Sequence, residues 1–205
     1  MDTPQPAMQA KRFTFGAVLT FIRKSWRDYL FLFLLAGVII ALDQWTKYLV
    51  RTNIPLAGDW LPSWLAWLAP YARIRYWYNS GAAFGIFQEG NLIFSILAVI
   101  VACLIVYYFP RVSREDWWLR LAMSMQLAGA LGNLIDRIMF KHVTDFISVG
   151  NFAVFNVADS SISVGVAILV LGVWIKENAD KKKAAAAKAA EAEPVAPKGD
   201  EAKGE

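Results

Sequence analysis

The sequence predicts an all-α membrane protein with four transmembrane helices, a small extracytoplasmic cap of β-sheet and loops, and a short interfacial helix. Three observations lead to this prediction. Hydrophobic residues make up 57% of the 205 residues and charged residues only 19%, which leaves too few charges to cover a soluble globule. Four apolar stretches are long enough to cross a bilayer, which takes about 20 residues in a helix. The few polar residues inside three of these stretches lie towards one end.

The composition also excludes several classes of protein and site. The net charge is only +4 and the mean hydropathy is +0.39, so a soluble domain, a disordered chain and a nucleic-acid-binding protein are ruled out. Cys103 is the single cysteine and His142 the single histidine. A disulfide within the chain or a cysteine-based zinc site is therefore impossible, and a His-rich metal site is not expected. Nine tryptophans are typical of a protein that meets lipid head groups.

The four predicted spans cover residues 29–50, 92–109, 117–140 and 152–175. A helix is expected in each span, because backbone polar groups in lipid must find partners within their own segment, and the alternating pattern of a β-barrel is not seen. Basic residues precede the first span, as they do in a secretory signal peptide. No small-residue cleavage site follows it, so an uncleaved spanning helix is expected.

Both ends of the chain are expected in the cytoplasm. Residues 11–27 mix aromatic and aliphatic side chains with basic ones, which favours a short helix lying on an anionic inner leaflet. Fifteen Lys and Arg residues flank the spans on the side of the termini, against four on the other side, and the positive-inside rule assigns the richer side to the cytoplasm. The chain then divides into a basic amphipathic segment (1–28), a four-helix membrane domain (29–175), and a low-complexity Ala/Lys/Glu tail (176–205) that is disordered or partly helical.

The long connection between the first two spans, residues 51–90, is expected to form the extracytoplasmic cap. Trp60, Trp64 and Trp67 recur at helical spacing, so a short helix would lay three indoles along the membrane interface. Residues 73–78 have the composition of a strand, which predicts a small sheet. At the end of this strand, Asn79 can donate and accept hydrogen bonds, and Gly81 permits close backbone approach. An ordinary tight turn would explain these two residues equally well.

Two of the spans carry polar side chains close together. Asp43 and Lys47 lie four residues apart in the first span, so they share a helix face and can pair. In the third span, Asn133 and Asp136 project to similar sides, and a carboxylate beside the Arg137 guanidinium at membrane depth favours a local ion pair. Both sets have a structural explanation as ion pairs that hold helices together, beside the functional one as a polar wall that supports a site.

Two further carboxylates follow the third span. Asp145 lies among apolar neighbours, and Asp159 lies three residues after Asn156 on one face of the fourth span. A lone ionised carboxylate on a spanning helix costs roughly 2.5 kcal/mol or more, so Asp159 must be protonated, paired through space, or in contact with water. Because the chain has no His cluster and no cysteine pair, the remaining chemistry is that of two carboxylates acting as general acid and general base. Spacing alone does not decide whether Asp145 or Asp136 is the partner of Asp159.

Five motifs, in this order, resemble those of lipoprotein signal peptidase (signal peptidase II, aspartyl peptidase family A8), a family of four-helix membrane peptidases of the bacterial inner membrane. The motifs are Asp43-Gln44-x-x-Lys47, Asn79-x-Gly81-Ala82-Ala83-Phe84-Gly85, Gly129-x-x-Gly132-Asn133-x-x-Asp136-Arg137, Val143-x-Asp145-Phe146 and Phe155-Asn156-x-Ala158-Asp159-Ser160. The resemblance covers about residues 29–175. The N-terminal extension and the tail lie outside it.

This resemblance implies a membrane endopeptidase that removes the signal peptide from prolipoproteins carrying a diacylglyceryl group, cutting on the amino side of the lipidated Cys. It implies Asp145 and Asp159 as the catalytic pair, with no cofactor and no metal. Residues expected to bind the substrate or to support the pair are Asn79, Gly81, Asn133, Arg137 and Asn156, with Asp43, Lys47 and Asp136 bracing the pocket. The expected partners are the lipidated substrate and membrane lipids, and not nucleic acid. A monomer in the inner membrane is expected, with the active site near the extracytoplasmic face.

Two other functions compete with this one. A metal-dependent lipid phosphotransferase would bind Mg²⁺ through carboxylates, but it would need several closely spaced Asp residues on one helix pair, which this chain lacks. A small proton- or ion-coupled transporter could use Asp159 in a relay, but four helices without an inverted repeat argue against it.

Overall fold

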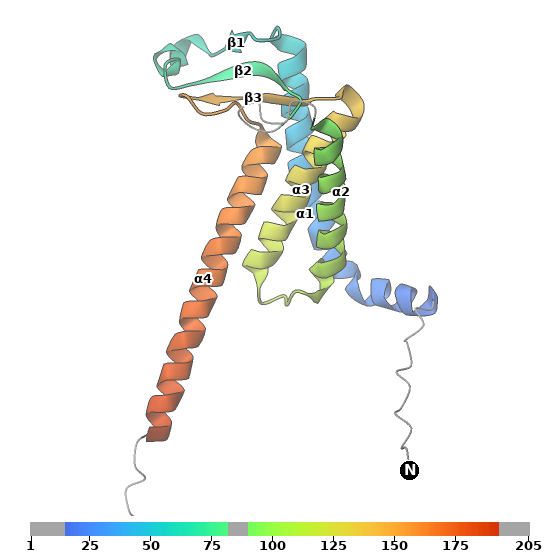
Figure 1. Ribbon diagram of the computed structural model, residues 1–205, viewed down its shortest axis with the longest axis vertical. Coiled ribbons are helices and arrows are strands. Elements are labelled where there is room, and N and C mark those ends of the chain that lie inside the picture. Colours follow the sequence, from blue (N-terminus) through green and yellow to red (C-terminus); the bar gives the residue numbers. More distant parts are fainter. Residues whose placement is uncertain (1–14, 82–89, 193–205) are drawn as a thin grey trace, which may run out of the picture.

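Four helices and a three-stranded sheet carry the architecture of the computed structural model, which describes residues 15–81 and 90–192 (Figure 1). The helices are α1 (Phe15–Asn53), α2 (Asn91–Tyr108), α3 (Trp117–Phe140) and α4 (Val157–Ala192). The strands are β1 (Asp59–Trp60), β2 (Ala72–Asn79) and β3 (Val143–Val149). The sheet lies across one end of the helix bundle, which is called the sheet end below.

Among the described residues, three helical segments are long and apolar enough to cross a membrane: Ser25–Asn53, Asn91–Arg111 and Val157–Ala186. The first two contain the first and second expected spans, and the third contains the fourth expected span from residue 157 onward. The third expected span coincides with α3, which has 24 residues, a length of about 36 Å. Helix α3 carries several buried polar residues, among them Arg120, Asn133 and Asp136, which face neighbouring helices and not lipid.

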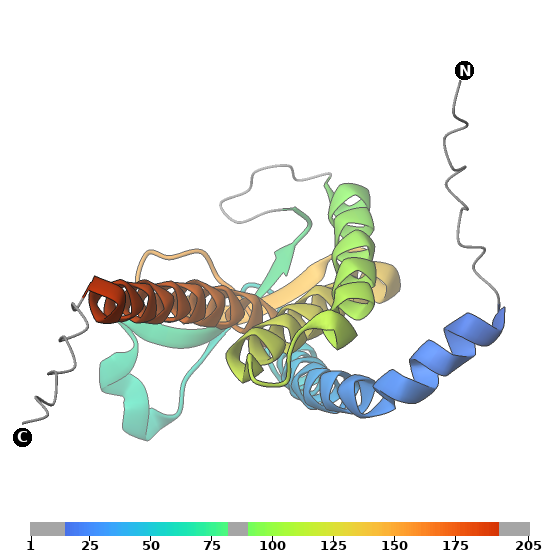
Figure 2. The same cartoon turned by 90° about the horizontal axis from the view of Figure 1, so that it is seen from below.

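The ends of the helices differ from the expected spans in two places. Helix α4 begins at Val157 and not at residue 152, because residues 152–156 form the connection from the sheet. At its other end α4 continues to Ala192, so the first part of the expected tail is helical and extends past the bundle (Figure 1). The N-terminal part of α1 runs sideways, away from the bundle (Figures 1 and 2), as an interfacial helix would. Residues 11–14 of that expected helix lie outside the described residues.

The sheet is antiparallel with the strand order β1-β2-β3. Strand β2 contains the expected strand at 73–78, whereas β1 and β3 were not predicted. The helix expected from Trp60 to Trp67 is only partly correct. Trp60 belongs to β1, where it pairs with Ile74, and a short 3-10 helix covers Ser63–Leu68. The three indoles are nevertheless all exposed, as an interfacial position requires.

Two apolar clusters hold the helices and the sheet together. The first joins α1, α2 and α3 through buried residues that include Leu32, Ile105 and Leu127. The second joins the sheet end of α1 to the sheet through Val50, Tyr76 and other residues. Seen along the bundle, α1, α2 and α3 gather together while α4 stands to one side, next to α3 (Figure 2).

Small residues on α3 allow this close packing. A β-carbon on Gly129 would collide with the Ala158 carbonyl oxygen of α4, and one on Gly132 would lie 2.8 Å from the Asp43 carboxylate of α1. The pair therefore allows neighbouring helices to approach closely on two sides of α3. Helix α3 then ends at Phe140, because Lys141 adopts a left-handed conformation with φ 67° and turns the chain back into β3.

Candidate active site

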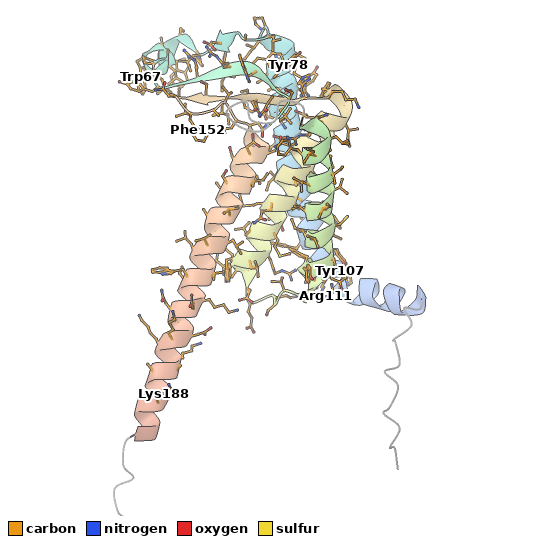
Figure 3. The ribbon with its side chains drawn as sticks, in the orientation of Figure 1. Trp67, Tyr78, Tyr107, Arg111, Phe152 and Lys188 are labelled. Atoms are coloured by element: carbon orange, nitrogen blue, oxygen red, sulfur yellow. The ribbon has the colours of Figure 1, made fainter. Side chains whose placement is uncertain are left out.

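The polar residues from all five sequence motifs meet where the helices reach the sheet. Strand β2 supplies Asn79 and strand β3 supplies Asp145. The polar residues of the first motif come from α1, and the others come from the last turns of α3 and from the start of α4. Figure 3 shows Tyr78 and Phe152 on the chain segments above and beside this junction.

The position of Asp159 follows from the way helix α4 begins. The Asp159 backbone N–H donates to the Asn156 side-chain oxygen at 2.9 Å, and the Asn156 backbone N–H donates back to Asp159 Oδ2 at 3.1 Å. This reciprocal pair is a capping box, with Asp in place of the more common Glu. A third free N–H of the first turn, that of Ala158, donates to Asp43 Oδ1 at 2.9 Å. The Asn-x-x-Asp spacing thus fixes the carboxylate of Asp159 at a helix N-terminus, where negative charge is stabilised.

Asp145 is 1% exposed on strand β3, and two amides hold its carboxylate. Asn79 Nδ2 donates to Oδ2 at 2.8 Å, and Asn156 Nδ2 donates to Oδ1 at 2.7 Å. Burial raises the pKa of the Asp145 carboxyl to about 7, and the nearby charge of Asp159 acts in the same direction, while the two amides oppose the shift. A carboxyl group in this setting can hold a proton near neutral pH.

A single residue, Asn156, joins the two carboxylates. Its amide nitrogen contacts Asp145 and its amide oxygen accepts from the Asp159 backbone. Asn133 adds a second link, because its amide nitrogen donates to Asp159 Oδ1 at 2.7 Å and its amide oxygen accepts from Asn156 at 3.1 Å. The charge of Asp159 reaches Asp145 strongly enough to affect its pKa. The two carboxylates therefore belong to one connected network.

A buried ionic cluster lies behind this network. Lys47 and Asp43 are both fully buried and form the expected ion pair at 2.8 Å. Lys47 Nζ also lies 3.4 Å from Asp136 Oδ2 and donates to Asn133 Oδ1 at 2.9 Å. Because Asn133 contacts Asp159, the cluster supports one side of the carboxylate network directly.

The local ion pair expected between Asp136 and Arg137 does not form. Asp136 instead contacts Lys47 and lies 3.6 Å from Arg51 Nη1, both on α1. Adjacent residues on a helix point about 100° apart, so the two side chains reach different neighbours. Arg137 points towards α2, with its guanidinium carbon 5.4 Å from the centre of the Phe94 ring.

Two further residues of the network, Arg51 and Thr144, were not expected from the sequence, and a third, Gln44, belongs to the first motif but was given no role in the site. Gln44 donates to Asp43, to Asp136 and to the Gly132 carbonyl oxygen. Arg51, which the sequence places in an exposed loop, is part of α1 and donates to the Thr144 hydroxyl at 3.0 Å. The Thr144 backbone N–H donates to Asp136 at 2.9 Å. Only the polarity of Gln44 inside an apolar stretch offered a signal.

A cavity of about 600 Å³ opens at Asp159. Asn79, Gly81, Asn133 and Arg137 line it together with Asp159, and the remainder of its wall is largely apolar. Asp145 is not in this wall; it lies directly behind Asn79, to which it is hydrogen-bonded. The other residues of the Asn79 motif, residues 82–85, lie outside the described part of the chain.

A second hollow of about 380 Å³ runs down the membrane domain from the same point. It shares Phe94, Asn133, Arg137 and Asp159 with the cavity. Apolar residues of α2 and α3, including Leu97 and Ala130, form most of its length. The hollow therefore offers an apolar surface that leads to Asp159.

Within residues 15–81 and 90–192, no three His, Cys, Asp or Glu side chains gather in a way that could hold a metal ion. The carboxylates of Asp43 and Asp136 are already paired with cations, and those of Asp145 and Asp159 accept hydrogen bonds from amides.

The chain is similar to known proteins in both sequence and fold. Residues 35–175 match the profile of the family described as signal peptidase (SPase) II. A lipoprotein signal peptidase from Halalkalibacterium halodurans is 40% identical over 154 residues, which are 73% of this chain and 96% of that protein. One from Shouchella clausii is 36% identical over 154 residues, covering 73% of this chain and 97% of the relative.

Solved structures agree with these matches. A bacterial membrane enzyme determined by the in meso method at 2.3 Å resolution superimposes with a TM-score of 0.66 and 30% sequence identity, covering 73% of this chain and 90% of that one. A second such enzyme, at 1.9 Å resolution, gives a TM-score of 0.61 and 31% identity, covering 69% of this chain and 91% of that one.

Proposed function

The chain belongs to the signal peptidase II family, and from that premise we propose that Asp145 and Asp159 are the catalytic pair of a lipoprotein-processing membrane peptidase. The enzyme removes the signal peptide from diacylglyceryl-modified prolipoproteins by cutting on the amino side of the lipidated Cys. The observation that carries the assignment is the bridge through Asn156, which contacts both Asp145 and Asp159 beside a cavity that a peptide can enter.

The two carboxyl groups have different surroundings, and this suits different tasks. Asp145 is enclosed and its pKa is raised to about 7, so it holds the proton of the pair in the resting enzyme. Asp159 borders the cavity and accepts a proton from the attacking water as general base. The pair titrates as a unit, so its macroscopic pKa values belong to both residues.

Cleavage then proceeds through a tetrahedral intermediate, and the two carboxyl groups carry the protons. Water held at the pair attacks the scissile carbonyl carbon, Asp159 takes one water proton, and Asp145 gives its proton to the developing oxyanion. When the C–N bond breaks, Asp159 protonates the leaving nitrogen of the lipidated Cys and Asp145 recovers its proton from the hydroxyl of the intermediate. The products are the signal peptide carboxylate and the free amine of the lipoprotein. No cofactor takes part.

The supporting residues act by position. Asn79 and Asn156 orient the Asp145 carboxylate, and Asn133 orients that of Asp159. Arg137 lines the substrate cavity, and its charge attracts the developing negative charge of the reaction. The buried cluster of Asp43, Lys47 and Asp136 fixes the position of Asn133.

The substrate enters sideways from the bilayer. The apolar hollow that joins the cavity at Asp159 accepts the signal segment and the acyl chains, while the cavity accepts the scissile peptide. The protein is a multi-pass protein of the bacterial inner membrane. In our proposal it is a monomer with both termini in the cytoplasm, so that the sheet and the active site are at the extracytoplasmic face.

The direct test is cleavage of a lipidated precursor by purified variants in detergent. Asp145→Asn and Asp159→Asn should each abolish the mass shift that marks cleavage before the modified Cys, while membrane insertion stays intact. Asp59→Asn is the matched control, because Asp59 lies in the same sheet but pairs with Arg75 at its surface. Near-normal turnover of either dyad variant would remove that residue from the catalytic pair.

A further inference from the structure

A separate charged cavity lies at the end of the bundle opposite the sheet. Its volume is about 270 Å³. Residues from α1, from the connection between α2 and α3, and from the start of α3 line it: Arg27, Asp28, Phe31, Arg114, Trp117 and Arg120. Figure 3 shows the neighbouring Arg111 and Tyr107 at this end, where α1 bends away from the bundle. None of these residues contributes to the carboxylate network.

Asp28 organises the cavity. Its carboxylate accepts from Arg114 Nε at 3.0 Å and from Arg114 Nη2 at 3.3 Å, and it accepts from Arg120 Nη2 at 2.7 Å. The Arg120 side chain is only 7% exposed, and its other terminal nitrogen donates to the Val112 carbonyl oxygen at 3.1 Å. One carboxylate thus fixes two guanidinium groups from different parts of the chain.

The cavity keeps an excess of positive charge. Three arginines line it against one aspartate, which leaves a formal charge of +2. Arg27 forms no ion pair with any described residue, and its guanidinium carbon lies 5.6 Å from the centre of the Trp26 ring. The Arg114 side chain is 60% exposed although it contacts Asp28. Two guanidinium groups therefore have donors free for a ligand.

The rim of the cavity suits a ligand with an apolar part. Phe31 and Trp117 line it and are 44% and 65% exposed, and Trp26 beside Arg27 is 54% exposed. Indole rings near the ends of spanning helices are typical of the boundary between head groups and acyl chains. A basic pocket between spanning helices, with aromatic residues at its rim, fits a phospholipid head group.

We propose that this cavity binds the phosphate of an anionic phospholipid, held between Arg27 and Arg114 with the acyl chains along Phe31 and Trp117. The fork of donors on each guanidinium matches phosphate oxygens, and the charge of +2 favours a lipid with a net negative charge over a zwitterionic one. Binding here stabilises the junction of α1, the α2–α3 connection and α3. The proposal does not depend on the peptidase function.

The test is a lipid titration of the full chain in detergent, followed by the apparent Tm and by native mass spectrometry. Dioleoyl phosphatidylglycerol should raise the apparent Tm and remain bound, whereas dioleoyl phosphatidylcholine should do so only weakly. Arg27→Gln and Arg114→Gln should each weaken the apparent affinity for phosphatidylglycerol about fivefold, as expected for one cation near a charged lipid. Arg27→Gln leaves the Asp28 contacts in place, so it reports on binding even if Arg114→Gln unfolds the loop.

Lys181→Gln is the matched control, because Lys181 is exposed on the same side and pairs with Glu177. It should bind phosphatidylglycerol like the unaltered protein. Equal losses in Arg27→Gln and Lys181→Gln would show diffuse attraction to negative charge and would overturn the proposed site. Equal stabilisation by both lipids would do the same. Stabilisation by inorganic phosphate alone, at the same concentration as the lipid, would overturn the assignment to a lipid.

Discussion

Asn79 on strand β2 donates a 2.8 Å hydrogen bond to the carboxylate of Asp145 on strand β3, across the antiparallel pairing of the two strands. This contact favours the ionised form of Asp145 and opposes the effects of burial and of Asp159. The sheet therefore does more than cover the helices. It adjusts the proton affinity of a carboxyl group that we assign to catalysis.

We expect kcat/KM for a lipidated precursor to fall as the pH rises through about 7. The pKa of Asp145 is raised to about 7, so above this pH the pair loses the proton that the reaction needs. Measuring kcat/KM in detergent over a series of pH values gives the descending limb of the pH–rate profile. A rate that stays constant from pH 6 to pH 9 would contradict the proposed proton on Asp145.

Replacing Asn79 tests directly whether its hydrogen bond lowers the pKa of Asp145. Asn79→Ala removes a donor that stabilises the Asp145 carboxylate, so the pKa of Asp145 should rise further and the descending limb should move to higher pH. The maximal rate should fall, because the carboxylate is less well oriented. Ser80→Ala, one residue along, is the control and should leave the limb in place. A limb that moves to lower pH in Asn79→Ala would mean that the hydrogen bond has the opposite effect.

Asp145→Asn should stabilise the protein more at pH 8 than at pH 5. The folded state raises the pKa of Asp145 from 3.8 to about 7, so between these values the folded state binds more protons than the unfolded state. Stability is therefore lost as the pH rises through this window, and the whole cost is present above pH 7. Asparagine does not titrate and avoids the cost. The apparent Tm of both proteins at the two pH values measures the difference, and a constant difference would count against the raised pKa.

Removing one charge from the buried ionic cluster should destabilise the protein more than removing an oppositely charged pair. Lys47→Met leaves the carboxylates of Asp43 and Asp136 in the interior without their shared cation, which should destabilise the fold by about 3–5 kcal/mol. The double variant Asp43→Asn, Lys47→Met removes one charge of each sign and should recover part of that loss. Unfolding in detergent compares the single and double variants. If the double variant were less stable than Lys47→Met, the two residues would not be coupled as their contact indicates.

Close packing around α3 gives a prediction with a built-in comparison. In Gly132→Ala the new methyl group would lie 2.8 Å from Asp43 Oδ2 and 3.2 Å from the Ala158 side chain, so stability should fall by about 1–3 kcal/mol and activity with it. Gly37→Ala meets nothing within 4 Å and should be neutral or slightly stabilising. Equal effects of the two substitutions on the apparent Tm would show that helix propensity, and not close packing, determines the change in stability.

A chelator should leave cleavage unchanged. The proposed reaction uses only carboxylates and water, whereas a metal-dependent phosphotransferase would lose its activity in EDTA. The measurement is the initial rate with and without EDTA after dialysis, with added Mg²⁺ as the reverse control. Loss of activity that Mg²⁺ restores would favour the phosphotransferase.

The sequence predicted the helices well because lipid imposes a simple rule on them. An apolar run must form its own hydrogen bonds, so a helix over about residues 117–140 could be predicted, and α3 covers Trp117–Phe140. The start of α4 was misplaced because Phe152 and Phe155 are as apolar as the span, while the capping box of Asn156 and Asp159 decides where the helix begins. Strand β3 was missed, since its seven residues are short and include the charged Asp145.

The contacts of the site were less accessible than its members. Four-residue spacing predicts the pairing of Asp43 with Lys47, because both residues lie on one helix. The partners of Asp136 come from α1 and β3, and no pattern within α3 reveals them. The same holds for Asn156, whose two amide atoms contact residues from a strand and a helix. Such links depend on how the elements are arranged in space, which local spacing does not contain.

The cluster around Lys47 also bears on biogenesis. Asp136 on α3 has its cations on α1, so α3 alone in lipid would carry an unmatched carboxylate at a considerable cost. Lys47 and Arg51 precede Asp136 in the chain and therefore emerge from the ribosome first. We therefore expect this chain order to help α3 insert. In a nascent chain whose α1 inserts late or in the wrong orientation, α3 should remain outside the lipid.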